Sequence, residues 1–418
     1  MKKDTCSESP IKKGYSKTNH RISKMEGNNS MKKKISNTLL SLFIVIFYVS
    51  VSYAEQYNTD AVDLNPGNLN LTIKNMEIQG NPTDIQLTFA PNPADPENIY
   101  WKLGDITPGL QMKTVYKDTF AYRETITTVE SDPLERHQLD IYYTDNPTSN
   151  KVIMFVPGGA WRQGDKDSYE ALGKTLVGIH GFTLAVVNYR ISNDTGGNAV
   201  HPDHIQDVAS AFKWLKQNIA PYGDPDTFYL FGQSAGAHLV SLLATDRKWL
   251  NAVGYDLSDI KGVISMSASY YLPDLVTYPD NPLGLSADDT VVFKKLMLDA
   301  FGGWSDADLV DPSPQSHINP DQPPFLVIYS YNDISGFGPE AENFVKAVKT
   351  LDPAPEIALR AIEFSDYTDE VWETAVTQAS QEPVLAEFVG HWAEVIAINP
   401  NEPTGYVTKL IVEFFQSH

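Results

Sequence analysis

Short apolar runs alternate with helical patterns along most of the chain beyond residue 137. The runs are QLDIYY (138–143), KVIMFV (151–156), FTLAVVN (182–188), TFYLF (227–231), GVISM (262–266), PFLVIYS (324–330) and IALRAIEF (357–364). Between them, apolar residues recur at helical spacing in 204–220 and in 234–245. Continuous apolar strands separated by amphipathic helices predict an α/β fold, with a mostly parallel sheet covered by helices on both faces.

The segment before these runs has a different pattern. Residues 55–125 are rich in Pro, Asn and Asp, as in NPGNLN and APNPADPEN, with a few short strand-like pieces such as NLTIKNMEI and DIQLTF. This pattern predicts a loop-rich extension over 55–125. The α/β domain is then expected to occupy 126–418.

A targeting segment is predicted near the N-terminus. Met31 is followed by three lysines and then by the apolar stretch LLSLFIVIFYVSVSYA, which ends at Ala54. A basic start, a short apolar core and a small-x-small ending are typical of a signal peptide, here 31–54, cleaved near Ala54. Residues 1–30 are then an over-long N-terminus, and the protein is expected to be exported, to the periplasm or beyond. An uncleaved membrane anchor remains the alternative, although the run is shorter than the roughly 20 residues that span a bilayer.

Charge and cysteine content change the picture after cleavage. The single cysteine, Cys6, lies upstream of the cleavage site, so the processed chain has no disulfide. Of the 32 Lys+Arg and 53 Asp+Glu residues, 10 and 3 lie in 1–54, so the net charge changes from −21 to 22 − 50 = −28. Such a surface repels nucleic acid and anionic lipid, and it keeps the protein soluble.

The chemistry-bearing positions of an open α/β sheet follow the carboxyl ends of its strands. After TFYLF comes Gly-Gln-Ser-Ala-Gly, Gly232 to Gly236, at a strand-to-helix junction. A Gly-x-Ser-x-Gly match alone is weak, but this junction is where a nucleophile elbow must lie. Ser234 is therefore the predicted nucleophile, and a helix-capping serine is the alternative.

A serine nucleophile needs a histidine base, which follows it in the chain order of elbow enzymes. His238 lies one helical turn beyond Ser234 and is expected to be structural. Behind the strand 324–330 only His391 and the terminal His418 remain. A free chain end is poorly held, so His391 is the predicted base, and Gly390 before it suits an exposed turn.

The acid that orients the base should follow the strand PFLVIYS. Asp333 lies in the next turn, YNDISG, and is the predicted acid. Asp366 and Asp369, after the last apolar run, remain rivals, and a plain turn-forming aspartate is the other alternative for Asp333.

Backbone donors for an oxyanion are expected after an earlier strand. PGGA, 157–160, follows KVIMFV, and its glycines would let a substrate carbonyl approach the backbone. The predicted donors are the N–H groups of Gly159 and Ala160, with Ala235 after the nucleophile. Gly158 forms the turn, and an ordinary strand-to-loop turn is the alternative.

Several motifs together resemble a known family. FVPGGAWRQGDK, VVNYR, GQSAGAHL, DPSPQSHI before PPFLVIYS, and the late Gly-His pair look like an α/β-hydrolase esterase, nearest to small carboxylesterases similar to hormone-sensitive lipase and arylformamidase. The resemblance covers about residues 130 to 418. It implies the α/β-hydrolase fold and cofactor-free hydrolysis of esters, less often of amides. It also implies that 267–322, with Tyr270, Tyr271 and Trp304, forms a partial cap.

Two departures from the family pattern stand out. Pro157 occupies a position where the family usually has a histidine that supports the loop, so stiffness rather than hydrogen bonding would order this loop. His391 lies 27 residues beyond Phe364, where the family has a short loop. An inserted helix near 368–381 is therefore expected to fold the chain back.

The sequence as a whole predicts a serine hydrolase that cleaves carboxylic esters through an acyl-enzyme, without a metal or another cofactor. An arylformamidase-like amidase and a non-catalytic binding protein of the same fold are the alternatives. His201 and His204, in HPDH, suggest a metal enzyme, but the wider ligand set is missing and Pro202 reads better as a helix start.

The expected partner is a small-molecule ester, and no nucleic acid is expected. Contact with a membrane is expected only through an uncleaved signal segment. Trp161, Tyr331 and Trp392 each adjoin a motif and are candidates for lining the pocket. The oligomeric state, the acyl and alcohol specificity and the role of 55–125 do not follow from the sequence.

Overall fold

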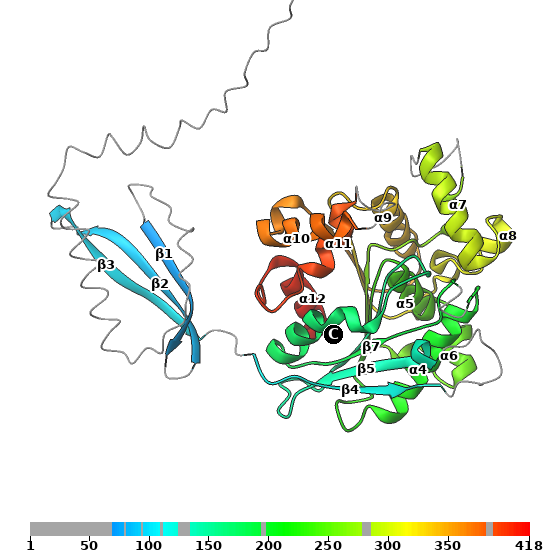
Figure 1. Cartoon of the computed structure of the whole chain (residues 1–418), viewed down its shortest axis with the longest axis horizontal. Helices are drawn as coiled ribbons and strands as arrows, with labels where there is room; N and C mark the ends of the chain where they lie inside the picture. Colours follow the sequence, from blue (N-terminus) through cyan, green and yellow to red (C-terminus); the bar gives the residue numbers. More distant parts are fainter. Residues whose placement is uncertain are drawn as a thin grey trace, which may run out of the picture. The chain divides into compact units, whose positions relative to one another are not determined.

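The computed structural model describes most of the chain in two units (Figure 1). The described residues are 69–78, 81–92, 95–108, 112–123, 134–193, 198–277, 286–381 and 388–418. The predicted signal peptide 31–54, its cleavage near Ala54 and the over-long start 1–30 lie outside them. The units are Met1–Leu110 and Gln111–His418.

The described part of the first unit is an antiparallel sheet in the order β1-β2-β3. Its strands are β1 (Leu69–Ile78), β2 (Asn81–Asn92) and β3 (Asp95–Pro108). The two expected strand pieces, NLTIKNMEI and DIQLTF, lie in β1 and β2, but the strands are longer than expected and β3 was not predicted. Pro82 and Pro91 each lie one residue inside an end of β2, where a missing backbone N–H disturbs the ladder least.

The boundary of the second unit also differs from the predicted one at 125/126. Strand β4 (Tyr116–Ala121) pairs antiparallel with β5 (Gln138–Tyr143) and so belongs to the large sheet. The division falls at 110/111 instead. The sequence YKDTFA hid this strand because an edge strand, largely exposed, needs no continuous apolar run.

The large sheet confirms the predicted fold class. Its eight strands are ordered β11-β10-β9-β8-β6-β7-β5-β4. Parallel pairing joins the strands from β11 to β7, and β5 and β4 are antiparallel to their neighbours. The remaining strands are β6 (Val152–Val156), β7 (Thr183–Val187), β8 (Phe228–Gln233), β9 (Gly262–Met266), β10 (Phe325–Ser330) and β11 (Ile357–Ile362).

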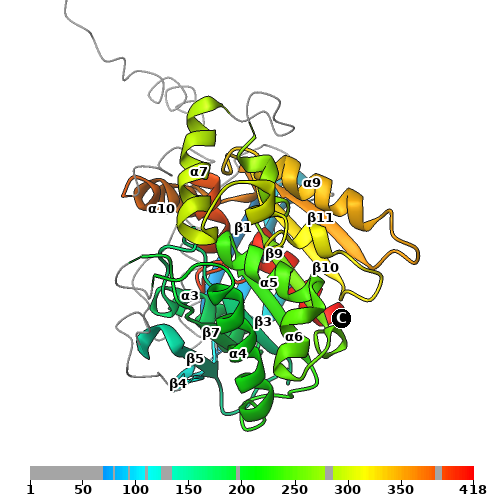
Figure 2. The same ribbon diagram turned by 90° about the vertical axis from the view of Figure 1, so that its right-hand side faces the viewer.

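Helices cover both faces of this sheet, as the continuous apolar strands predicted (Figures 1 and 2). Along β6, Met154 packs into the core on one face, while Ile153 and Phe155 pack into the core on the other. The first face carries α4 (Asp203–Asn218), α5 (Ala235–Thr245), α6 (Arg247–Val253) and α9 (Phe337–Val348). The second carries α3 (Glu170–Gly173), α10 (Asp369–Ala379), α11 (Val389–Ile396) and α12 (Tyr406–Ser417).

Two further helices belong to the predicted cap segment 267–322. They are α7 (Ala287–Phe301) and the short α8 (Asp306–Leu309), and α7 stands out at the top of the domain in Figure 2. Helix α10 confirms the inserted helix expected near 368–381. Short 3-10 helices lie at Leu134–His137, Lys166–Tyr169, Leu257–Asp259, Leu272–Leu275, Pro314–His317 and Phe364–Asp366, and a π-helical turn at Lys174–Ile179.

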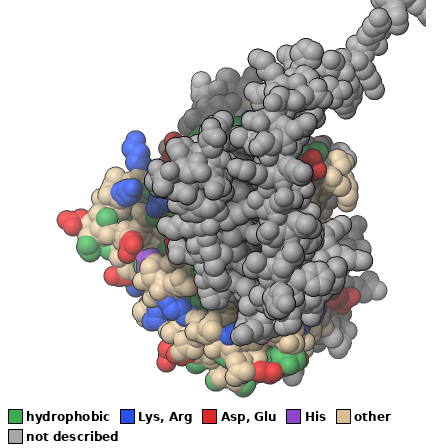
Figure 3. Space-filling model, turned by 90° about the vertical axis from the view of Figure 1, so that its left-hand side faces the viewer, with side chains coloured by type: hydrophobic (Ala, Val, Ile, Leu, Met, Phe, Trp, Pro, Cys, Tyr) green, Lys and Arg blue, Asp and Glu red, His purple; other side chains and the backbone are tan. Residues whose placement is uncertain are grey.

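None of the helices in the described part of the chain has both the length and the apolar character needed to cross a bilayer. On the face shown in Figure 3, the visible acidic and basic side chains of the described residues lie scattered among other side chains.

Candidate active site

Ser234 occupies the sharp turn between β8 and α5. Its backbone has φ of 56° and ψ of −124°, a conformation that is costly for a residue with a side chain. A Cβ atom on Gly236 would lie 1.9 Å from the Val156 carbonyl oxygen, and one on Gly232 would lie 2.4 Å from the Gly236 oxygen. Only glycine fits at both positions. The Ser234 side chain makes no capping hydrogen bond to α5, so the geometry is that of a nucleophile elbow.

The predicted base and acid are in direct contact. His391 Nδ1 lies 2.8 Å from Asp333 Oδ1, and their side chains are 4% and 5% exposed. The backbone N–H of Ile334 also donates to Asp333 Oδ1, at 2.7 Å. Asp333, in the loop after β10, is thus the carboxylate that meets the imidazole.

The second ring nitrogen of His391 faces the end of β8. Gln233 Nε2 lies 3.2 Å from His391 Nε2 and 3.1 Å from the His391 carbonyl oxygen. Because the ionised Asp333 carboxylate can only accept, His391 Nδ1 carries the proton and Nε2 is the acceptor. This tautomer is the one that a general base needs. His391 and Ser234 line the same cavity, although no hydrogen bond joins these two described residues.

The backbone around His391 is not the exposed turn that Gly390 suggested. Both residues lie in the first turn of α11 and are buried. A Cβ atom on Gly390 would lie 1.6 Å from the Tyr331 carbonyl oxygen, and the Gly390 N–H donates to the Asn332 oxygen at 3.1 Å. Glycine is present because α11 approaches the loop that carries Asp333.

The predicted oxyanion loop follows β6 and adjoins the elbow. Gly159, Ala160 and Trp161 all have positive φ, at 122°, 51° and 58°. Gly159 and Ala160 line the cavity together with Ala235. An ideal Cβ atom on Gly158 would lie 2.9 Å from Ser234 Cβ, so the loop comes very close to the nucleophile.

Hydrogen bonds support this loop, contrary to the expectation that the stiffness of Pro157 alone would order it. The buried hydroxyl of Tyr189 donates to the Pro157 carbonyl oxygen at 3.0 Å. Trp161 Nε1 donates to His238 Nδ1 at 3.3 Å, and His238 Nε2 in turn donates to the Pro312 carbonyl oxygen at 2.8 Å. Burial lowers the pKa of His238 to about 3, so this histidine is neutral and structural, as predicted.

A cavity of about 530 Å³ opens over the elbow. Helix α7 forms one wall, so the cap segment does cover the site, but Tyr270, Tyr271 and Trp304 are not among the lining residues. Leu275, Val292, Phe293, Leu296, Met297, Ile334 and Phe337 make up the apolar side of the cavity.

Two of the three aromatic residues predicted to line the pocket do so. Trp161 and Trp392 line the cavity, whereas Tyr331 does not. Tyr331 is 50% exposed and its ring contacts Phe364 and Trp372 on the outside of the domain. Its place in the chain next to the acid turn was misleading, because its ring packs against Phe364 and Trp372 and does not line the cavity.

Sequence reasoning missed three polar residues beside Asp333 and His391. They are Gln233, Ser267 and Glu394. Glu394 is fully buried, and burial followed by the nearby charge of Asp333 raises its pKa well above the ordinary range. The signal was its position three residues after His391 in an amphipathic helix, which places both side chains on one face.

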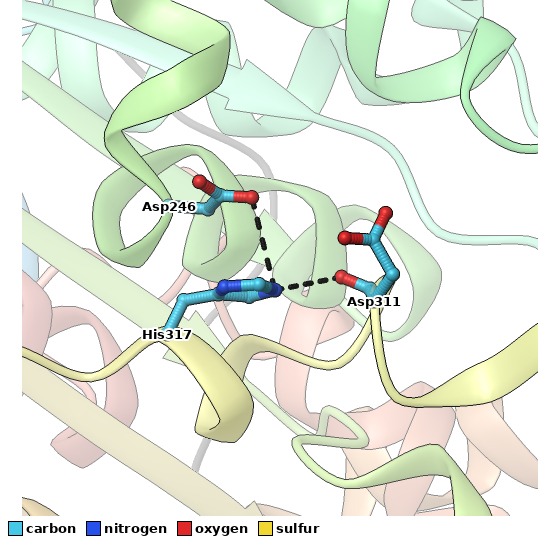
Figure 4. Close-up of side chains that lie close together, drawn as sticks. All are labelled: Asp246, Asp311 and His317. Carbon is cyan, nitrogen blue, oxygen red and sulfur yellow. Dashed lines mark hydrogen bonds and ion pairs between the residues drawn. The ribbon is translucent and has the colours of Figure 1, made fainter. Parts of the chain in front are cut away.

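Possible metal ligands gather elsewhere in the described residues, at Asp246, Asp311 and His317 (Figure 4). His317 Nε2 lies 2.8 Å from the Asp311 carbonyl oxygen and 3.7 Å from Asp246 Oδ2. The ammonium of Lys248 already pairs with both carboxylates, at 2.9 Å and 2.7 Å, so a cation is present within the protein itself.

The two histidines of HPDH do not form a common ligand set. His204 Nε2 lies 2.9 Å from Ser192 Oγ, and His201 Nε2 lies 3.4 Å from Asp311 Oδ2. Burial lowers the pKa of His204 to about 3. Both side chains are engaged with different partners.

The sheet order, the elbow and the contact between His391 and Asp333 at the carboxyl ends of the strands are those of the α/β-hydrolase fold. Residues 139–336 match the BD-FAE family model, and the chain is related to carboxylic ester hydrolases and methylesterases. The matched range includes Ser234 and Asp333; His391 lies beyond it.

The individual comparisons agree with this assignment. The chain is 30% identical over 262 residues to the probable carboxylic ester hydrolase LipM of Mycobacterium tuberculosis, covering 60% of this chain and 57% of LipM. It is 29% identical over 263 residues to the isoprenylcysteine alpha-carbonyl methylesterase ICME of Arabidopsis thaliana, covering 61% and 59%. It thus spans less than two thirds of these relatives. Esterase B from Lactobacillus rhamnosis has the same fold, with a TM-score of 0.53 at 17% identity over 73% of this chain and 87% of that one.

Proposed function

We propose that the protein hydrolyses carboxylic esters through a Ser234–His391–Asp333 triad and an acyl-enzyme. The observation that carries this proposal is the 2.8 Å contact between His391 Nδ1 and Asp333 Oδ1, at the cavity that Ser234 also lines. The relatives named above, which include ester hydrolases, support the same reaction class.

In the first step, Ser234 Oγ attacks the ester carbonyl carbon while His391 Nε2 takes its proton. Asp333 holds the imidazole in the tautomer with Nδ1 protonated and stabilises the imidazolium that forms. Rotation about the Cα–Cβ bond of Ser234 brings Oγ to Nε2, which now accepts from Gln233. The backbone N–H groups of Gly159, Ala160 and Ala235 bind the developing oxyanion.

The ester carbon–oxygen bond then breaks as the imidazolium of His391 protonates the leaving alcohol, which completes the acyl-enzyme. Water then enters, His391 takes one of its protons, and the resulting hydroxide attacks the acyl carbon bound to Ser234. The carbon–Oγ bond breaks, His391 gives the proton that it took from water to Ser234 Oγ, and the carboxylic acid leaves.

The cavity suggests the class of ester. One side consists of the apolar side chains of α7 and its neighbours, and the oxyanion loop faces it. A volume of about 530 Å³ accommodates a small molecule. We therefore propose an ester with one apolar group, held against α7.

The test is hydrolysis of p-nitrophenyl acetate and butyrate by wild type and Ser234→Ala. Loss of at least about 10³-fold in kcat is expected for Ser234→Ala. Ser210→Ala is the matched control, because the Ser210 hydroxyl bonds within α4 to the Gln206 carbonyl oxygen and does not line the cavity. A fluorophosphonate probe should label wild type at Ser234 and leave Ser234→Ala unlabelled. Turnover by Ser234→Ala at the wild-type rate would refute the mechanism.

The amidase alternative shares the triad, so it is separated by substrate. We expect short acyl esters to be cleaved with a higher kcat/KM than N-formylkynurenine, because no described feature of the cavity selects an amide. A reversed preference, abolished by Ser234→Ala, would assign amide hydrolysis instead.

A further inference from the structure

A second buried carboxyl group lies behind the acid of the proposed triad. Ser267, which follows β9, makes a short hydrogen bond to Asp333 Oδ2, and its Oγ lies 2.7 Å from Glu394 Oε2. Glu394 Oε1 accepts from Gln233 Nε2 at 3.2 Å. Glu394 is 0% exposed and Ser267 is 1% exposed, so no bulk water reaches this contact.

The number of hydrogen atoms in this cluster determines its protonation. Two oxygen–oxygen contacts, from Ser267 to each carboxyl group, need two hydrogen atoms. A serine hydroxyl supplies one, and an ionised carboxylate supplies none. One of the two carboxyl groups therefore carries a proton and donates to Ser267 Oγ.

The surroundings assign that proton to Glu394. Asp333 accepts from the backbone N–H groups of Ile334 and Ser330, at 2.7 Å and 3.3 Å, and from His391, and all of these donors stabilise its anion. Glu394 has only the Gln233 amide besides Ser267. Burial raises the pKa of Glu394 well above its usual range, and the charge of Asp333 acts in the same direction.

We propose that Glu394 is a positioning residue, held as a neutral carboxylic acid, that donates to Ser267 and through it to Asp333. The chain Glu394–Ser267–Asp333–His391 fixes the rear oxygen of Asp333, so that the front oxygen stays directed at the imidazole. This inference rests on the proposed triad for its role in catalysis, although the protonation of Glu394 can be measured without any reaction.

The neutral state of Glu394 also keeps His391 usable as a base. An ionised Glu394 would add a second negative charge beside Asp333, which would favour the imidazolium and raise the pH at which His391 becomes free to accept a proton. The neutral acid avoids this charge and still supplies a donor. A carboxyl group can thus support the triad without competing with Asp333.

Other titratable side chains around Glu394 do not change the assignment of the proton to Glu394 rather than to Asp333. Tyr270 and Tyr367 are the tyrosines on which the charge of Glu394 acts, and burial raises the pKa of both phenols, so they stay neutral. Within the described residues, the side chains that influence the pKa of Glu394 are Asp333, Ser267 and Gln233. None of them is a Lys or Arg that would favour the ionised form.

The protonation is tested by infrared difference spectroscopy at neutral pH. The C=O stretching band of a protonated carboxylic acid should be present in wild type and missing in Glu394→Gln. Glu340→Gln is the control, because Glu340 is a second buried glutamate, on α9, with its own raised pKa. It should remove a different band. If Glu394→Gln removes no band, the inference is wrong, whether or not the protein hydrolyses esters.

The role in catalysis is tested by the pH profile of kcat/KM for p-nitrophenyl butyrate. Glu394→Gln should lower kcat/KM by less than about 10-fold and keep the pKa of the acid limb within about 0.3 units, because neither side chain carries charge. Glu394→Ala, which removes the hydrogen-bond donor to Ser267, should lower kcat/KM at least about 10-fold more than Glu394→Gln does. An acid-limb pKa lowered by about one unit in Glu394→Gln would show an ionised Glu394 and overturn the inference. Equal kcat/KM values for Glu394→Gln and Glu394→Ala would also overturn the inference. A completely inactive wild type would instead refute the proposed function.

Discussion

Replacing Gly390 by alanine should separate the proposed base from its acid. In the structure a Cβ atom at this position would lie 1.6 Å from the Tyr331 carbonyl oxygen, whereas real Cβ contacts essentially never fall below 3.0 Å. The backbone must therefore open by at least 3.0 − 1.6 = 1.4 Å. Since the obstacle is a backbone oxygen, no side-chain rotation relieves the overlap.

The size of the effect follows from the distances around His391. Its Nδ1 lies 2.8 Å from Asp333 Oδ1, and a displacement of 1.4 Å along that contact gives about 4.2 Å, beyond hydrogen-bond range. A misplacement of about 1 Å in a catalytic group can reduce the rate about 10²-fold. We therefore expect Gly390→Ala to lower kcat by about 10²-fold or more and to change KM much less.

The assay is steady-state hydrolysis of p-nitrophenyl butyrate, with circular dichroism to verify folding. Gly405→Ala is the matched control, because its Cβ atom would be no nearer than 3.2 Å to the Glu402 oxygen and Gly405 precedes α12, away from the cavity. A folded Gly390→Ala protein with kcat within about threefold of wild type would show that α11 does not set the position of His391.

Two other perturbations test the interior and the cavity. Burial raises the pKa of Glu340 to about 8, so the folded state keeps a proton that the unfolded state loses above about pH 4.5, and stability should fall between about pH 4.5 and 8. Glu340→Gln should remove that part of the slope in urea titrations, because its amide oxygen can still accept from the N–H groups of Tyr270 and Tyr271; an unchanged slope would exclude Glu340 as its source. Met297→Trp, on the cavity side of α7, should lower kcat/KM for p-nitrophenyl octanoate about 10-fold more than for the acetate, whereas Val291→Trp, on the exposed side, should affect both alike. Equal losses for the two esters in Met297→Trp would show that the acyl chain lies elsewhere.

Local patterns were sufficient to predict most of the α/β domain. Every apolar run from 138 onward became a strand of the large sheet, because strands covered on both faces are mainly apolar. Ser234 was predictable because the elbow is a short contiguous motif at a strand–helix junction. Asp333 and His391 followed from chain order, since few histidines remained after the nucleophile.

Most of the features that the sequence did not predict depend on contacts between segments that are far apart in the chain. Ser267 and Glu394 are 127 residues apart, and Gln233 and Glu394 are 161 apart, so no sequence window contains the hydrogen bonds that join them. Gly390 looked like an exposed turn because its clash partner, the Tyr331 oxygen, comes from another element. Strand β4 was missed for a different reason, since an edge strand can be mostly polar.

Strained backbone conformations gather at the carboxyl ends of the parallel strands, where the proposed active site lies. Among the described residues, the non-glycine positions with positive φ that follow β6, β8, β9 and β10 are Ala160, Trp161, Ser234, Ser267 and Asn332, and Asn198 alone lies elsewhere. These four strands are consecutive in the sheet, so the strained turns form one row. Each strained turn costs roughly 1–3 kcal/mol and persists only when its surroundings fix it.

The buried strands of the sheet hold two of these strained turns in place. The Ser234 N–H donates to the Met266 oxygen, and the Ser267 N–H donates to the Ile328 oxygen, both at 2.8 Å. Each strained serine is therefore tied to the end of the neighbouring strand. The Ser234 turn is thus held by β9 and the Ser267 turn by β10. These hydrogen bonds hold Ser234 and Ser267, which are far apart from Asp333 and His391 in the chain, at the edge of the sheet where the proposed triad lies.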